Sequence, residues 1–437
     1  MIAPGVAGRS LPEAARAFRH RNFRLFWFGQ LISLVGTWMQ GVAQGWLVLQ
    51  LTNDPLALGL VAAAQFTPVI VFGLFAGVLA DAVSKRAALI VTQFGAMILA
   101  LILGLLVLTG AVEVWHVLVL AVLLGVVNAV DMPVRQAFVV EMVGREDIAN
   151  AVALNSAVFN GTRIIGPAIA GLLIATVGLA VCFLFNAASY VAVILGLVLM
   201  RSSELQARPA SALQRSVRSV IDQLTEGLRY VRDEPAIRLA LVVLGIVATV
   251  ALNFQVLLPL LARDVLGGDA GTFGFLMAAG GIGSLTSSLQ IAFGLRPTLR
   301  LLLVGAAAIG VAAVGLAVSR WLPLSLALML VSGWGMIAMA ATTNTLIQLS
   351  TPDTLRGRVM GVYTTTFAGS VPVGGLFAGS VAAVAGAPMA LAVGGVLAIV
   401  TVAAASLRLP APRPTAVTVE RSVDREPAVA DPSAGRR

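Results

Sequence analysis

The sequence DMPVRQAFVVEMVGREDIANAVALNSAVFNGTRIIGPAIAG, residues 131–171, begins inside one apolar segment, passes through a charged turn and enters the next apolar segment. Three charged residues in it have otherwise apolar surroundings: Asp131, Arg135 and Arg163. A glycine and proline cluster lies within the second apolar segment: Gly161, Gly166, Pro167 and Gly171. Because a charge in hydrocarbon is costly unless it is paired or faces water, we interpret this stretch as a hinge beside a polar pathway through a membrane.

The composition of the whole chain is that of a membrane protein. Hydrophobic residues make up 59% and charged residues 11% of the 437 residues, with a mean hydropathy of +0.96, whereas a soluble domain has about 25% charged residues. Apolar stretches of roughly 20 residues recur, each long enough to cross a bilayer as a helix. The sequence predicts an all-α membrane protein with twelve spans: 23–51, 56–80, 87–109, 114–138, 148–176, 179–200, 237–262, 271–293, 298–318, 322–347, 354–383 and 387–407.

The spans divide into two halves around one long polar connection. The segments that we predict are an N-terminal cytoplasmic segment at 1–22, a six-helix half at 23–200, a linker at 201–236, a second six-helix half at 237–407 and a disordered cytoplasmic tail at 408–437. Apolar residues at helical spacing in the linker predict an amphipathic helix on the membrane interface. Proline and glycine recur at matching places in the two halves, which indicates diverged copies with a transport site between them.

The distribution of basic residues predicts the orientation of the chain. Arg163 lies within a span, and Arg263 and Arg320 lie in connections on the side opposite the N-terminus, which leaves 26 of the 29 lysines and arginines on the N-terminal side. By the positive-inside rule, both termini of this multi-pass protein of the cell membrane are cytoplasmic. The net charge of +9 therefore reflects contact with a lipid bilayer, and we do not expect nucleic acid as a partner.

The sequence carries no sign of an enzyme. Cys182 is the only cysteine, and the two histidines, His20 and His116, are expected near opposite ends of spans, so neither a disulfide nor a metal cluster is predicted. A phosphate-binding loop of an ATP-driven pump is also missing. We expect no cofactor and no catalytic residues.

The first span carries a polar stripe. Its members follow spacings of three and four residues, which place them on one helical face: Gln30, Ser33, Thr37, Gln40 and Gln44. In lipid such a face must meet protein or water. The stripe could form hydrogen bonds between helices, but its length along the span favours the lining of a central cavity.

Other polar residues within spans are candidates for the same cavity: Asn128, Asn160, Arg163, Asn253 and Asn344. Phe66, Phe159, Phe254 and Trp334 could supply apolar walls, and such a mixture suits a hydrophobic or amphipathic small molecule. For Arg163 the residues leave two roles open: binding an anionic group of the substrate, or hydrogen bonding to carbonyl groups and amide side chains nearby.

The connection after the second span, GVLADAVSKR at residues 77–86, resembles the cytoplasmic signature of the major facilitator superfamily. Gly77, Leu79, Asp81, Lys85 and Arg86 match that signature, whereas Ala82 and Ser84 depart from it. The resemblance implies two pseudo-symmetric six-helix halves that Asp81 locks together on the cytoplasmic side. The gate residues that it implies are Gly77, Asp81, Lys85, Arg86, Asp131, Arg135, Arg356 and Arg358. Alternatively, Lys85 and Arg86 only set the topology.

Several further motifs resemble the enterobactin-exporter and macrolide-efflux-like branch of the superfamily. They are the start of the stretch at 131–136, GTWMQ at 36–40, LPLLARDVLGG at 258–268 and LRGRVMGVY at 355–363. The spacing Gly161-x4-Gly166-Pro167-x3-Gly171 resembles the antiporter motif of exporters, in which proline bends the helix and glycine admits a close neighbour; kinked packing alone is the alternative.

The resemblance implies a secondary transporter that exports a drug, macrolide or siderophore by alternating access and proton antiport, acting as a monomer. Asp131 is the one acid clearly within a span and could carry the proton, but its place towards the cytoplasmic end, near the gate, favours a structural or gating role. Two other functions stay open on the residues alone. One is an importer or lipid transporter with the same fold, and the other is a membrane receptor that does not transport.

Overall fold

The computed structural model describes residues 13–206 and 217–408, except for the side chains at 13–14, 74–82 and 217–221. These ranges are helical throughout, with short connections. The elements in chain order are η1 (Glu13–Arg19), α1 (Arg21–Thr52), α2 (Pro55–Ala82), α3 (Lys85–Leu108), α4 (Val114–Thr176), α5 (Leu179–Val198), η2 (Ser202–Glu204), α6 (Val217–Asp233), α7 (Pro235–Ala251), α8 (Phe254–Leu260), η3 (Leu261–Val265), α9 (Ala270–Ala292), α10 (Leu299–Val318), α11 (Leu322–Ser350) and α12 (Asp353–Ser406).

Nine helical segments among the described residues are long and apolar enough to cross a membrane. Two of them, α4 and α12, contain one non-helical residue each, Gly144 with φ 73° and Gly386 with φ 82°. Because this left-handed backbone region favours glycine, each glycine marks a turn between two consecutive rods. With the 32-residue α1, the described helices are consistent with the twelve spans expected.

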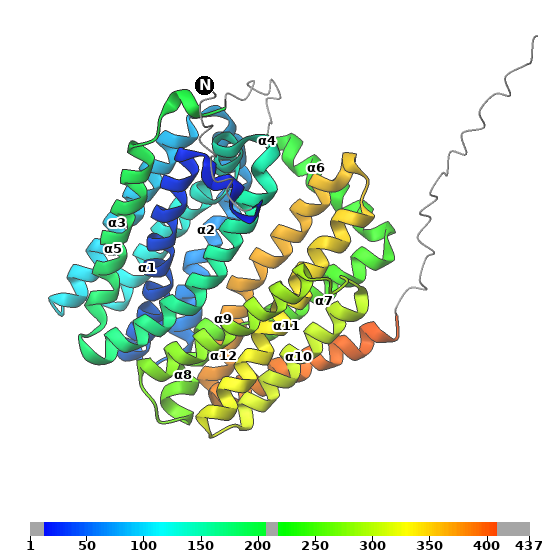
Figure 1. Ribbon diagram of the computed structural model, residues 1–437. Helices are drawn as coiled ribbons and strands as arrows, with labels where there is room; N and C mark the ends of the chain where they lie inside the picture. Colours follow the sequence, from blue (N-terminus) through cyan, green and yellow to red (C-terminus); the bar gives the residue numbers. More distant parts are fainter. Residues whose placement is uncertain (1–12, 207–216, 409–437) are drawn as a thin grey trace, which may run out of the picture.

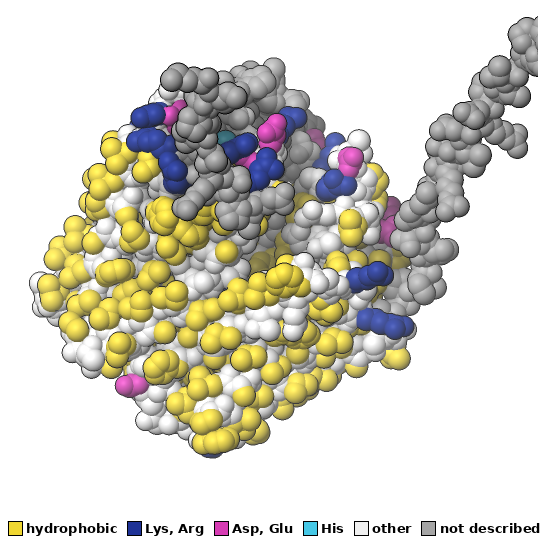
Figure 2. Space-filling view, viewed as in Figure 1, with side chains coloured by type: hydrophobic (Ala, Val, Ile, Leu, Met, Phe, Trp, Pro, Cys, Tyr) yellow, Lys and Arg dark blue, Asp and Glu magenta, His cyan; other side chains and the backbone are white. Residues whose placement is uncertain are grey.

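The two halves of the chain lie side by side (Figure 1). The first half contains α1 to α5, and the second contains α7 to α12. We call the end of the bundle that holds η1 and α6 the N-terminal side, and the other end the opposite side (Figure 1). Lys, Arg, Asp and Glu side chains gather mainly at the N-terminal side, while hydrophobic side chains cover much of the surface below them (Figure 2).

The two halves meet closely towards the opposite side. A Cβ atom on Gly171 of α4 would lie 2.8 Å from Gly271 Cα of α9, and one on Gly379 of α12 would lie 2.9 Å from the carbonyl oxygen of Pro55 in α2. Gly59 of α2 faces the backbone of α12 in the same way. Small residues let membrane helices approach this closely, so the glycines form a seam that closes the opposite side.

One polar contact also joins the halves on the opposite side. Arg263 of η3 donates a hydrogen bond from Nη2 to Oδ1 of Asn53, at 2.6 Å. Asn53 ends α1 with φ 51°, in the left-handed region that asparagine tolerates. The η3 segment is a π-helix, a distortion that often occurs at functional sites.

The linker and the terminal segments are described only in part. Helix α6 lies within the predicted linker and packs on α12, where Glu226 forms an ion pair with Arg358. A Cβ atom on Gly227 would lie 2.7 Å from the carbonyl oxygen of Arg358, so this face of α6 is fitted to α12. Residues 1–12, 207–216 and 409–437 of the predicted segments lie outside the described residues.

Candidate functional site

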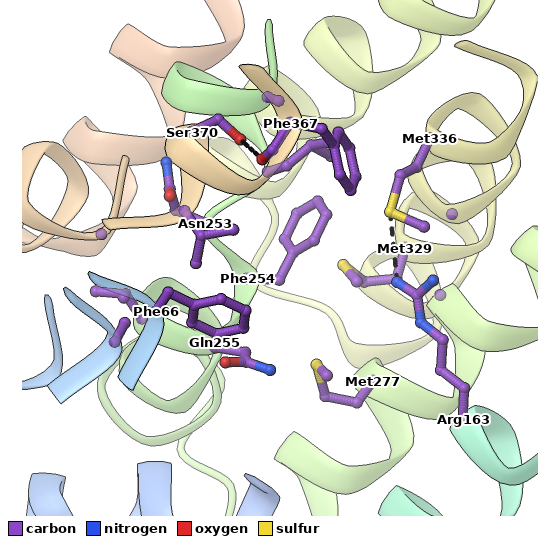
Figure 3. Close-up of a pocket in the computed structure, with 18 of the residues that line it drawn as sticks. Phe66, Arg163, Asn253, Phe254, Gln255, Met277, Met329, Met336, Phe367 and Ser370 are labelled. Atoms are coloured by element: carbon purple, nitrogen blue, oxygen red, sulfur yellow. Dashed lines mark hydrogen bonds between the residues drawn. The ribbon is translucent and has the colours of Figure 1, made fainter. Parts of the chain in front are cut away.

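A cavity lies between the two halves in the middle of the bundle (Figure 3). It contains about 960 Å³ of empty space, including the part that is open to solvent. Both halves contribute to its walls, which is where a transport site is expected between repeats. The lining residues are Trp38, Ala62, Phe66, Arg163, Ala248, Leu252, Asn253, Phe254, Gln255, Val256, Met277, Gly280, Met329, Gly333, Met336, Phe367, Ser370, Val371 and Gly375.

Most of the cavity wall is apolar and polarisable. Aromatic rings and three methionine thioethers dominate it, with few polar side chains: Asn253, Gln255, Ser370 and Arg163. Methionine is flexible and adapts to differently shaped partners. An apolar wall with a few polar groups is typical of sites that bind amphipathic small molecules.

Arg163 reaches into the cavity from α4 towards α11 (Figure 3). Its Nη2 lies 3.4 Å from Sδ of Met336, and its Cζ lies 5.7 Å from the ring centre of Trp38. None of the ion pairs found in the described ranges involves Arg163. A cation therefore lies among apolar groups at the junction of the halves.

A break between α7 and α8 brings polar groups to the cavity. Helix α7 ends at Ala251, and Asn253 precedes the new helix with φ −93° and ψ 42°. The side chain of Asn253 donates a hydrogen bond to the carbonyl oxygen of Thr249, at 2.7 Å. Broken helices at membrane depth occur where backbone lines a cavity, and this break places Phe254 and Gln255 in the wall.

The polar stripe of α1 lies mainly in contacts within the first half. Gln40 accepts a hydrogen bond from Asn186 of α5 at 2.6 Å, and Gln44 donates one to Gln65 of α2 at 3.3 Å. Gln30 and Ser33 are 5% and 4% exposed, and Thr37 donates to the carbonyl oxygen of Ser33. None of the five stripe residues is among the lining residues of this cavity, and Gln40 and Gln44 form hydrogen bonds between helices.

Three predicted cavity residues also lie away from this wall. Asn128, Asn160 and Asn344 are not among the lining residues. Asn160 donates to the carbonyl oxygen of Ser156, one turn earlier, and Asn344 accepts from Gln348. Of the predicted polar cavity residues, the structure thus brings Arg163 and Asn253 together.

The predicted gate residues of α3 bind within the first half. Nζ of Lys85 lies 2.8 Å from a carboxylate oxygen of Glu141 in α4. Arg86 donates to the carbonyl oxygens of Leu197 and Val198, at 2.7 and 2.8 Å, and so caps the end of α5. The side chain of Asp81, like the surroundings of Gly77, lies outside the described residues.

Asp131 ties α4 to α3. It is 4% exposed and accepts hydrogen bonds from Thr92 at 2.7 Å and from Gln93 at 2.8 Å. Arg135 forms the predicted ion pair with the same carboxylate one helical turn later. Since Asp131 is held by three side chains, the geometry favours the structural or gating role over proton carriage.

The two arginines of α12 bind within α12 and to the linker helix α6. Arg356 forms an ion pair with Asp353 at 2.6 Å, and Arg358 forms one with Glu226 of α6. Neither forms an ion pair with the Asp131–Arg135 pair. In the described ranges, no ion pair on the N-terminal side therefore joins the first half to the second, in contrast to the seam on the opposite side.

A buried carboxylate at the start of the second rod of α4 holds the N-terminal segment. Asp147 is 1% exposed and lies 2.7 Å from Arg19, 2.8 Å from His20 and 3.5 Å from Arg16. The hydrogen bond with His20 and the charges of Arg19 and Arg16 lower the pKa of Asp147 from its ordinary value of 3.8, against the opposing effect of burial. No local sequence pattern indicates this cluster, because Asp147 and its partners are 127 or more residues apart.

The glycines of the antiporter-like motif have different neighbours. A Cβ atom on Gly166 would lie 2.5 Å from Cβ of Trp38, which couples α4 to α1 within the first half, whereas one on Gly171 meets α9 of the second half. Gly161 has open space where a Cβ atom would be. The carbonyl oxygen of Pro167 is the atom nearest to the position that a Cβ atom on Gly274 of α9 would take.

Comparison with known proteins assigns the chain to a family. A family model described as a transmembrane secretion effector, of the major facilitator type, matches residues 13–435. The chain is 32% identical over 375 residues to the multidrug efflux pump Tap of Mycolicibacterium fortuitum, which covers 83% of this chain and 89% of the relative. It is 27% identical over 350 residues to the enterobactin exporter EntS of Escherichia coli O1:K1 / APEC, covering 79% and 81%.

A solved structure confirms the fold alone. A bacterial homologue of the human lysosomal transporter Spinster, in an inward-facing and occupied conformation, aligns with a TM-score of 0.68 at 13% identity. The alignment covers 91% of this chain and 97% of that chain.

Proposed function

The chain belongs to the transmembrane secretion effector family of the major facilitator superfamily, as its motifs predicted, and we propose that it exports amphipathic small molecules. It is a multi-pass membrane transporter and not an enzyme, because the superfamily consists of transporters. The observation that supports the proposal is the cavity between the halves, with its aromatic and methionine wall. The names of two relatives, a multidrug efflux pump and an enterobactin exporter, support drugs or siderophores as substrates.

Alternating access is the mechanism that we propose for this export. The glycine seam holds the halves together on the opposite side, whereas none of the described ion pairs of the N-terminal side joins the first half to the second. The basic surplus supports a cytoplasmic N-terminal side. In this orientation, the closed seam faces away from the cytoplasm, and the cavity is ready to receive a cytoplasmic substrate.

Proton antiport by a monomer completes the proposal. Its support is the resemblance of residues 161–171 to the antiporter motif of exporters. Asp131 is bound to Arg135, Thr92 and Gln93, so we assign it to holding α3 and α4 together. The candidate gate residue Asp81 would then close the N-terminal side in the other state of the cycle.

Everted membrane vesicles with an imposed pH gradient test this function. A panel of dyes, macrolides and siderophores is added, and dissipation of the gradient is compared with that in vesicles without the protein. We expect at least one panel member to dissipate the gradient only when the protein is present. Accumulation in the reverse direction would instead favour an importer, and saturable binding without movement would favour a receptor.

A pair of phenylalanine variants connects transport with the cavity. Phe254→Ala removes a ring that lines the cavity and is 9% exposed, whereas Phe293→Ala removes a ring at the end of α9 that is 87% exposed. We expect a severalfold loss of apparent affinity for Phe254→Ala, since a buried ring supplies much apolar contact, and none for Phe293→Ala. Equal effects of the two variants on apparent affinity would show that the substrate is not bound in this cavity.

A further inference from the structure

We propose that the substrate carries an anionic group, a carboxylate or an acidic phenol, and that Arg163 binds this group in the central cavity. The inference rests on the proposed transport function. Among the described residues that line this cavity, Arg163 is the only charged one. Since no acid lies among the described lining residues, the guanidinium gives the part of the wall that they form a formal charge of +1 in an apolar surrounding.

The contacts of Arg163 leave most of its hydrogen-bonding capacity unused. A guanidinium has five N–H donors, and the partner found for them is the Met336 thioether, a weak acceptor. The ring of Trp38, 5.7 Å from Cζ, adds a cation–π contact. A desolvated cation without a counter-charge is costly, and an anion entering the cavity would supply the missing acceptors.

Other arginines in the described ranges have the oxygen partners that a structural role provides. Arg135 has a carboxylate partner one turn away, and Arg86 has two carbonyl oxygens and the hydroxyl of Ser202 within 2.8 Å. In the described ranges, no hydrogen bond from Arg163 to a carbonyl or amide oxygen was found, as its alternative role would require, and the acceptor found is the thioether of Met336. The head of Arg163 is instead directed at the empty space and at Met336 of the other half (Figure 3).

The rest of the wall restricts the ligand further. Phe66, Phe254 and Phe367 provide rings, and Met277 and Met329 provide thioethers around the same space (Figure 3). Guanidinium groups bind carboxylates in a bidentate manner, and aromatic walls favour flat apolar ligands. The ligand class is therefore an aromatic organic anion.

The position of Arg163 also connects ligand binding with the contact between halves. The backbone carbonyl oxygen of Arg163 lies 3.1 Å from the place where a Cβ atom on Gly281 of α9 would be. Its head contacts Trp38 in the first half and Met336 in the second. An anion that binds Arg163 would compete with the contact to Met336, so occupancy would weaken a link across the halves.

The test measures binding and transport of a matched pair of probes. One probe is an aromatic carboxylate dye, and the other is its methyl ester. The ester lacks the negative charge and carries one additional methyl group. Equilibrium binding to the purified protein in lipid nanodiscs and uptake into everted vesicles are measured for the wild type, Arg163→Met and Arg163→Lys. Arg238→Met is the matched control, because Arg238 is exposed and donates to the carbonyl oxygen of Arg232.

We expect the wild type to bind the carboxylate more tightly than its ester by roughly ten- to hundredfold, the range of hydrogen bonds to charged groups. Arg163→Met should lose this preference while its affinity for the ester stays within about twofold. Arg163→Lys should keep part of the preference, and Arg238→Met all of it. Because a partly buried cation without an ion-pair partner in the described ranges is removed, the thermal unfolding temperature of Arg163→Met should not fall.

Several outcomes would overturn the inference. They are equal affinity of the wild type for the two probes, an unchanged preference in Arg163→Met, or an equal loss for both probes. If Arg163→Met does not fold, the affinities of the wild type and of Arg163→Lys for the two probes still test whether Arg163 binds the anionic group. Charge-selective binding without uptake would support the anion site and contradict the transport function, whereas uptake without charge selectivity would do the reverse.

Discussion

The glycine seam between α4 and α9 gives a prediction about the conformational equilibrium. In Gly171→Ala, the new methyl group would lie 2.8 Å from Gly271 Cα and 3.1 Å from the carbonyl oxygen of Ala270. Both atoms belong to the backbone of the other half, so no side-chain rotation can remove the overlap. The substitution therefore opposes the state in which the opposite side is closed.

The distances set the size of the effect. Carbon atoms pack best at about 3.5–4.0 Å, so the halves must separate locally by roughly 0.7 Å or more. Overpacking of this kind costs about 1–3 kcal/mol. If this cost falls on the closed state alone, the ratio of closed to open molecules falls by roughly 5- to 150-fold.

Distances between spin labels measure this ratio. Ala111, in the connection between α3 and α4, and Val384, 90% exposed at the end of the first rod of α12, are suitable label sites in different halves on the opposite side. Cys182, the only cysteine, is buried and is replaced beforehand. We expect Gly171→Ala to shift the distance distribution towards longer separations.

The control lies in the same helix and the same motif. Gly161→Ala adds a methyl group where no atom lies within 4 Å, and it shares the gain in helix propensity, which therefore cancels in the comparison. We expect Gly161→Ala to keep the wild-type distribution. The reasoning is refuted if the two variants give the same distribution, or if Gly171→Ala shifts it towards shorter distances.

Two further predictions concern polar contacts at the two ends of the bundle. Because its pKa is lowered in the folded protein, Asp147 contributes stability that is present above the ordinary carboxyl value of 3.8 and is lost as the pH falls through the lowered value. Asp147→Asn should therefore lower the unfolding temperature relative to the wild type at neutral pH, and by less in acid. A difference in unfolding temperature between variant and wild type that does not vary with pH would contradict this. Asn53→Gly keeps the left-handed backbone but removes the hydrogen bond from Arg263. It should shift the same label distances severalfold less than Gly171→Ala, and an unchanged distribution would show that this bond does not hold the side closed.

The fold could be predicted from the sequence because each span carries its own signal. Length and hydropathy locate apolar helices without any knowledge of their neighbours. The charged turn at 139–147 was also visible, but the structure continues the first rod of α4 to Val143 and turns at Gly144 alone. A single glycine in the left-handed region suffices for a turn, and no pattern distinguishes it from the many glycines used for packing.

The site could be predicted only in part, because spacing shows which residues share a helical face and not which neighbour that face meets. The α1 stripe is one face as expected, yet its glutamines Gln40 and Gln44 meet α5 and α2. Trp334, expected in the wall, donates instead to Gln290 at an exposed position. The methionines of the wall gave no signal, since Met is common in apolar spans and only tertiary packing directs it to the cavity.

Arg163 was identifiable for an electrostatic reason that does not depend on packing. A charge deep in an apolar span must have a purpose or a partner, and the partner is absent among the described ion pairs. The break before Phe254 lacked such a signal, because Asn253 is a mild polar residue and neither glycine nor proline marks the place.

The positions of the close contacts also indicate where the halves would pivot. Along α4, the approach to α9 begins at Arg163 beside Gly281, continues at Pro167 beside Gly274 and ends at Gly171. The eight residue steps from Arg163 to Gly171 span about 12 Å of helix, all of it from the cavity towards the opposite side. Rocking about the level of Arg163 would therefore open the seam at its Gly171 end first, while the cationic head stays next to the ligand. The residue proposed to bind the anion thus lies where the smallest movement is needed, so binding can persist until the opposite side is open.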